Sequence, residues 1–223
     1  MSAASKQPSK KRPRVAAPAD FESAAGVSRE TVLRLEIYAN ELVRWQQTVN
    51  LVGESTLAIL WQRHMLDSLQ LLRLLPDEPS PLVDLGSGAG FPGLALAIAG
   101  VADVHLVEAD SRKAAFLAEV ARLTDTEITL HTKRIEHVAP VVAGVVTARA
   151  LAPLPLLLGH AARFSGPETV GLFHKGRDWR RELTDTREAW TMDIRCEPSI
   201  VEPESVIMRV EHLRPARSDD RAG

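Results

Sequence analysis

Residues 81–93 read Pro81-Leu-Val-Asp84-Leu-Gly86-Ser-Gly88-Ala-Gly90-Phe91-Pro92-Gly93 and are followed by an apolar run, 94–99. The short apolar stretch before the glycines predicts a buried strand, the glycines predict a tight turn, and the proline predicts the first turn of a helix. Because glycine has no Cβ, a ligand can lie against the main chain there, facing the free N–H groups of the helix start. The segment therefore predicts a nucleotide-binding loop.

Two ligand classes fit this loop. Its second half satisfies the dinucleotide fingerprint G-x-G-x-x-G, with Glu108 at a suitable distance to bind a ribose. Asp84, however, is unfavourable beside a pyrophosphate and favourable beside the ammonium group of S-adenosylmethionine (AdoMet). The order D-x-G-x-G-x-G thus resembles the AdoMet-binding loop of Rossmann-like methyltransferases. An NAD-binding oxidoreductase is disfavoured by Asp84 and by the lack of an evident hydride-transfer site, and a turn used only for packing is the remaining alternative.

Composition indicates an ordinary globular protein. The 223 residues suffice for one sizeable domain with a modest extension, and no apolar run approaches the roughly 20 residues of a membrane span. A formal net charge of −2 means that any nucleic-acid binding must come from local basic patches. The single cysteine, Cys196, excludes an intramolecular disulfide and a cysteine-based zinc cluster, and we expect no metal site. Without an apolar signal-peptide core, a cytoplasmic location is expected.

The chain divides into four expected parts. Residues 1–20 carry basic side chains without periodicity and predict a disordered tail, which could add affinity for RNA phosphates or be dispensable. An N-terminal helical extension, 21–78, should contain one helix from Ser28 and a second from about Thr56 to Leu74. The AdoMet-binding methyltransferase domain follows at 79–213, and 214–223 form a second disordered tail.

The second predicted helix contains a polar cluster, Arg63-His64-Met-Leu-Asp67-Ser68. His64 and Ser68 lie four residues apart on an otherwise apolar face, and His64 and Asp67 are close enough to touch. This pattern fits a hydrogen-bonded core histidine braced by Asp67, and it fits a functional site equally well.

After the loop, strands and helices alternate. Strands are expected at 104–108, 128–131, 141–147 and 169–174, and helices at 112–123, 153–164 and 179–190. Two late strands, 191–197 and 204–211, should form an antiparallel hairpin at the sheet edge. The predicted fold class is α/β: a Rossmann-like AdoMet-dependent methyltransferase fold with a mostly parallel sheet, an antiparallel late strand and an N-terminal helical extension.

Ligand-binding side chains are expected at the carboxyl ends of these strands. Glu108 or Asp110 would hold the ribose, and the turn 134–137 would adjoin the adenine. Arg149 would bind a phosphate or the AdoMet carboxylate, the alternative being a surface salt bridge. Lys175 would contact RNA or simply be solvated.

Five motifs occur together in order: Asn50-Leu51, the segment 63–68, the segment 84–93, Thr147-Ala-Arg149-Ala150 and Lys175-Gly176. On these motifs the chain resembles the RsmG family, also called GidB, over roughly residues 32–210. The resemblance implies AdoMet-dependent N7 methylation of one guanine in 16S ribosomal RNA. It also implies 16S ribosomal RNA or a small-subunit assembly as the partner, and we expect a monomer.

Site residues follow from the resemblance by position. The AdoMet site would comprise Gly86, Gly88, Gly90, Phe91, Glu108, Ile135, Glu136 and Arg149. The substrate side would comprise His64, Asp67, Ser68 and Lys175. Guanine N7 carries no proton to remove, so no general base and no catalytic acid–base residue are expected. A methyltransferase acting on another RNA or on a small molecule, and an RNA-binding chaperone that retains the fold, are the alternatives.

Overall fold

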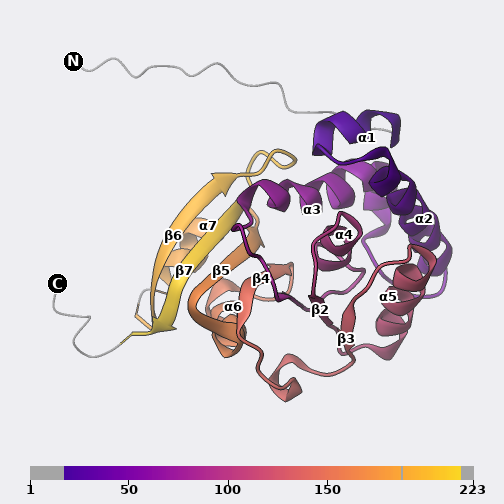
Figure 1. Cartoon of the computed structure of the whole chain (residues 1–223). Helices are drawn as coiled ribbons and strands as arrows, with labels where there is room; N and C mark the ends of the chain where they lie inside the picture. Colours follow the sequence, from indigo (N-terminus) through magenta and orange to yellow (C-terminus); the bar gives the residue numbers. More distant parts are fainter. Residues whose placement is uncertain (1–17, 187, 217–223) are drawn as a thin grey trace, which may run out of the picture.

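The computed structural model describes residues 18–186 and 188–216. Within them, seven strands form one sheet in the order β3-β2-β1-β4-β5-β7-β6 (Figure 1). The first five strands are parallel, whereas β7 runs antiparallel to both β5 and β6. The expected fold class, including the late antiparallel hairpin at the edge, is confirmed. The strands are β1 (Leu82–Leu85), β2 (Val104–Val107), β3 (Thr129–His131), β4 (Ala143–Arg149), β5 (Ser165–Lys175), β6 (Trp190–Pro198) and β7 (Val206–Pro215).

Helices cover both faces of the sheet (Figure 1). Successive side chains of β1 point to opposite faces of the sheet. Leu82 packs in one core with the helices 29–46, 93–98 and 111–123, whereas Val83 and Leu85 pack in another core with the helix 154–161. The main helices are α1 (Pro18–Ala25), α2 (Arg29–Gln46), α3 (Asp67–Leu69), α4 (Gly93–Ile98), α5 (Ser111–Leu123), α6 (Leu154–Ala161) and α7 (Trp179–Thr184). Short turns of 3₁₀ helix lie at η4 (Ile135–His137) and η5 (Ala162–Phe164).

Several elements differ from the sequence expectation. Helix α1 was not expected and begins at Pro18, and β7 continues to Pro215, so regular structure extends past the limits 21 and 213. Helix α7 ends at Thr184 instead of near Trp190, because Trp190 already pairs with Pro215 in the β6–β7 ladder. Most of the two predicted tails, 1–17 and 217–223, lies outside the described residues.

The segment 54–74 is helical, as expected, but it is not one α-helix. It runs through a 3₁₀ helix η1 (Glu54–Ile59), a π-helical turn η2 (Trp61–Leu66), α3, and a second 3₁₀ helix η3 (Gln70–Leu74). Turns of π-helix inside helices often occur at functional sites. Here the π-helical turn contains Arg63 and His64.

The N-terminal helices share one core with the sheet. Helix α2 begins where predicted, with the Ser28 hydroxyl accepting a hydrogen bond from the Thr31 N–H, and it buries Leu35, Tyr38 and Leu42. Every residue of α4 is buried, since the sheet covers one side of this helix and the N-terminal helices cover another. The N-terminal helical extension therefore completes the core around the glycine loop.

Tyr38 connects this extension directly to the loop. Its hydroxyl donates a hydrogen bond to the Ala89 carbonyl, and its ring stacks on Phe91 with the centroids 5.1 Å apart. Gly90, between these two residues, has φ +93°, and a Cβ built there would lie 2.5 Å from the Tyr38 hydroxyl oxygen. The loop conformation and the tyrosine thus require each other.

Tyr38→Phe should lower the free energy of unfolding by about 1 to 2 kcal/mol, because the buried Ala89 carbonyl loses its donor while the ring stack is kept. Urea titration of the wild type and the variant measures the difference. Equal stability would show that the hydroxyl contributes nothing to holding the loop.

Candidate active site

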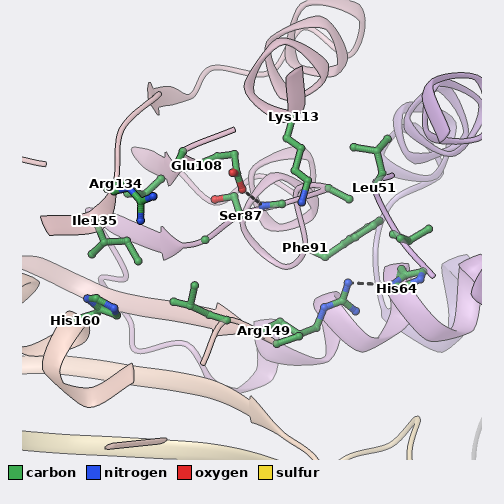
Figure 2. Close-up of a pocket in the computed structure, with 18 of the residues that line it drawn as sticks. Leu51, His64, Ser87, Phe91, Glu108, Lys113, Arg134, Ile135, Arg149 and His160 are labelled. Atoms are coloured by element: carbon green, nitrogen blue, oxygen red, sulfur yellow. Dashed lines mark hydrogen bonds between the residues drawn. The ribbon is translucent and has the colours of Figure 1, made fainter. Parts of the chain in front are cut away.

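A cavity of about 650 Å³ opens at the carboxyl ends of β1, β2 and β4 (Figure 2). One end is formed by Arg134, Ile135 and His160, and the other by Leu51, Phe91 and His64. A volume of this size is typical of small-molecule sites. The predicted site residues on its wall are Gly86, Gly88, Phe91, Glu108, Ile135, Glu136, Arg149 and His64.

Glu108 is fixed by the main chain around it. One carboxylate oxygen accepts from the Gly88 N–H and the other from the Asp110 N–H, each at 2.8 Å. Asp110 does not line the cavity. Its side chain caps α5 by accepting from the N–H groups of Arg112 and Lys113, and these hydrogen bonds lower the pKa of its carboxyl. The geometry favours Glu108 over Asp110 as the acid that faces a ligand.

Asp84 lies behind the glycine loop and does not face the cavity. Its side chain is fully buried on the α4 side of the sheet, where Gly93 packs against it, and one carboxylate oxygen accepts from the Thr147 hydroxyl at 2.7 Å. The other oxygen has no hydrogen-bond partner among the described residues. Burial raises the pKa of this carboxyl to about 6. The expected contact between Asp84 and a ligand ammonium is therefore absent from this arrangement, because strand alternation turns the side chain towards α4.

Arg149, at the end of β4, is not a surface salt bridge. Its side chain is 13% exposed, and its guanidinium carbon lies 4.9 Å from the centroid of the Phe91 ring. The guanidinium donates to His64 Nδ1 at 2.9 Å (Figure 2). Burial, together with the charges of Arg149 and Arg63, lowers the pKa of His64 to about 3. His64 is therefore neutral at physiological pH.

The model of one protein family, described as rRNA small subunit methyltransferase G (GidB), matches residues 32–207. The chain belongs to the GidB family. Ribosomal RNA small subunit methyltransferase G of Paramagnetospirillum magneticum is 51% identical over 201 residues, covering 90% of this chain and 98% of the relative. The protein of the same name in Rhodospirillum centenum is 51% identical over 196 residues, covering 88% and 91%. Family membership makes this chain a methyltransferase, with AdoMet as its cofactor.

Solved structures of low identity show the same fold. A ribosomal protein L11 methylase from Lactobacillus delbrueckii subsp. bulgaricus superimposes with a TM-score of 0.54 at 14% identity, over 67% of this chain and 79% of that one. TYW2 of P. horikoshii superimposes with a TM-score of 0.53 at 16% identity, over 70% and 63%. They support the Rossmann-like assignment.

Four of the predicted residues do not line the cavity. Gly90 faces Tyr38, and Ser68 is fully buried with its hydroxyl donating to the His64 carbonyl. Asp67 is buried beside Arg149, and Lys175 is buried in an ion pair with Glu182. A direct contact of Asp67, Ser68 or Lys175 with RNA would require these arrangements to open, so their assignment to the substrate side stays a prediction.

Three cations at the cavity mouth were not among the predicted site residues. Lys113 comes from the first turn of α5, and Lys133 and Arg134 from the turn before η4. None of the three forms an ion pair with any residue that the structure describes. The sequence did contain a signal for two of these cations. Lys113 lies five residues after Glu108, the acid at the end of the second predicted strand, and Arg134 adjoins Ile135. Sequence alone did not show which cations are free of acidic partners.

Among residues 18–186 and 188–216, no helix combines the length and apolar character needed to cross a bilayer.

Asp84→Asn should remove a pH dependence of stability. The pKa of Asp84 is higher in the folded protein than in the unfolded chain. Its contribution to the free energy of unfolding is therefore complete below about pH 4 and is lost as the pH rises through about 6. The free energy of unfolding of the variant, relative to wild type, should therefore rise by about 2 kcal/mol between pH 4 and pH 7.

Urea titrations of both proteins at several pH values test this, since the two share every other titrating group. A constant difference between the proteins across this range would contradict the raised pKa of the buried Asp84 carboxyl.

Proposed function

We propose that this enzyme transfers a methyl group from AdoMet to N7 of one guanine in 16S ribosomal RNA of the small ribosomal subunit. The observation that carries the proposal is one cavity in a chain of this family. The glycine loop 86–91 bounds it on one side, and residues 51–64 together with Arg149 bound it on the other. Relatives sharing half of the sequence are named for methylation of small-subunit ribosomal RNA. Such an activity belongs in the cytoplasm, with ribosome assembly.

The residues present fit AdoMet. Glu108, held by two backbone N–H groups, keeps further lone pairs for the ribose hydroxyls. The bare main chain at Gly86 and Gly88 allows close approach, and Ile135 and Glu136 would flank the adenine. Arg149 would bind the carboxylate of the methionine moiety. Once bound, AdoMet supplies an electrophilic methyl group on its sulfonium.

Methylation at N7 needs no proton transfer by the chain, since the purine nitrogen attacks with an unshared pair. The cavity fits a reaction without proton transfer. His64 is neutral, and both of its ring nitrogens are engaged in hydrogen bonds. The residues of the cavity would then orient the two reactants and exclude water, and the reaction itself requires no acid–base pair.

The cations at the mouth would bind the RNA backbone. Lys113, Lys133 and Arg134 are available for phosphates, whereas Lys175 and Arg177 are paired with Glu182 and Glu204. The major groove of A-form RNA is too narrow for side chains, so the target guanine has to be unstacked or in an irregular region.

Mass-spectrometric mapping of N7-methylguanosine in 16S ribosomal RNA, from cells with and without this gene, tests the function. One modified site should disappear and return with the wild-type gene. An unchanged map would contradict the proposal and point to another RNA or to a small molecule.

Gly86→Asp should fail to restore the modification. Gly86 has φ +65°, and a Cβ there would lie 2.5 Å from Leu151, so the charged side chain strains the turn and intrudes on the cofactor cavity. Calorimetry should show no AdoMet binding to this variant. Gly26→Asp is the matched control, because Gly26 has φ +67° with nothing within 4 Å and lies outside the cavity. Normal AdoMet affinity in Gly86→Asp would contradict the placement of the cofactor.

A further inference from the structure

The family motif Arg63-His64-Met-Leu-Asp67-Ser68 is not explained by contact with a ligand alone, since Asp67 and Ser68 lie outside the cavity. We propose that this motif positions Arg149, with His64 and Asp67 acting as positioning residues that fix its guanidinium towards the carboxylate of AdoMet. The proposal rests on the proposed function for the identity of the cofactor. The motif then belongs to the cofactor side of the site, whereas the resemblance had implied the substrate side for His64, Asp67 and Ser68.

Three of the five N–H groups of the guanidinium are held by the motif. Nη1 donates to the Arg63 carbonyl at 3.2 Å and to a carboxylate oxygen of Asp67 at 3.3 Å, and Nη2 donates to His64 Nδ1 at 2.9 Å. Nε–H and the second N–H of Nη2 make no hydrogen bond with any residue that the structure describes. A planar guanidinium fixed along one edge presents its remaining donors in a set direction, and a carboxylate can accept two of them.

His64 can serve this purpose only in one tautomer. Arginine has donors and no acceptor, so His64 Nδ1 must accept, and the ring proton must lie on Nε2. The surroundings enforce this: Nε2 lies 2.8 Å from the Thr56 hydroxyl oxygen, and the Thr56 hydroxyl proton is directed to the Gly53 carbonyl at 2.6 Å. Thr56 can therefore only accept from His64. The ring also stacks on Phe91, with centroids 5.0 Å apart.

Asp67 supplies the counter-charge. A buried cation is costly unless it is paired, and the Asp67 carboxylate is the acidic group in contact with Arg149. Asp67 is itself held, because its other carboxylate oxygen accepts from the Gln70 amide at 2.7 Å and its carbonyl accepts from His174 Nε2 at 2.8 Å. The carboxylate therefore has little freedom to leave Arg149 for an RNA group.

A double-mutant cycle with S-adenosylhomocysteine, which keeps the carboxylate and ribose of the cofactor, tests the proposal by calorimetry. His64→Phe retains a ring to stack on Phe91 but lacks the acceptor for Arg149. Arg149→Lys keeps a charge beside Asp67 but loses the planar fork. We expect His64→Phe to weaken binding about tenfold in the wild-type background and by less than about twofold in the Arg149→Lys background.

Independent effects of the two substitutions, multiplying in the double variant, would overturn the proposal, as would wild-type affinity in His64→Phe. Steady-state kinetics give a second reading. The KM for AdoMet should rise while the KM for the small subunit stays unchanged, and the reverse pattern would assign the motif to RNA contact. The binding measurement contains no RNA, so it stands even if the methylated base is another one.

Urea titration of each variant serves as the control for correct folding. Thr124→Val removes a buried hydroxyl at the far end of α5 and should lower stability without changing the affinity for S-adenosylhomocysteine. Should His64→Phe fail to fold, Thr56→Val tests the same link, because it removes the acceptor that fixes the His64 tautomer. Weaker binding in Thr56→Val supports the proposal, and unchanged binding overturns it.

Discussion

The positive charge of Arg149 is buried between the end of β4 and the helical segment 54–74, and much of the site follows from accommodating it. The carboxylate of Asp67 balances the charge, a neutral His64 accepts from it, and the ring of Phe91 covers it. Each of these groups is held in turn by a partner of its own. An ion pair in such a place contributes little net stability but leaves the guanidinium one well-defined orientation.

The N-terminal helices are part of the catalytic domain in a physical sense. They cover α4, brace the glycine loop through Tyr38, and supply one wall of the cavity from residues 51–64. Gln46 fixes that wall, since its side-chain oxygen accepts from the N–H groups of Leu51 and Val52 and its amide donates to the Val52 carbonyl. One wall of the cavity at this Rossmann-like sheet thus comes from a segment that precedes the sheet in the chain.

Two carboxylates near the loop illustrate how environment decides chemistry. Glu108 accepts two backbone N–H groups and faces the cavity. Asp84 lies in the neighbouring strand β1, yet it is fully buried and one of its oxygens has no hydrogen-bond partner among the described residues, and burial raises its pKa to about 6. The difference follows from the face of the sheet to which each side chain points.

The sequence by itself determined the strand, glycine turn and helix of the loop, the succession of later strands along the chain, and Glu108 as an acid at a strand end. These features depend on local periodicity, on glycine and proline, and on the rule that ligands bind at the carboxyl ends of parallel strands. Only the tertiary structure decided the partners of Arg149, which are 82 to 86 residues away, and the contact between Tyr38 and Ala89, which are 51 residues apart. It also decided that Lys175 is paired with Glu182, while Lys113 lines the cavity and forms no ion pair with a described residue. Such pairings depend on how distant elements pack, and no local pattern encodes which cation meets which acid.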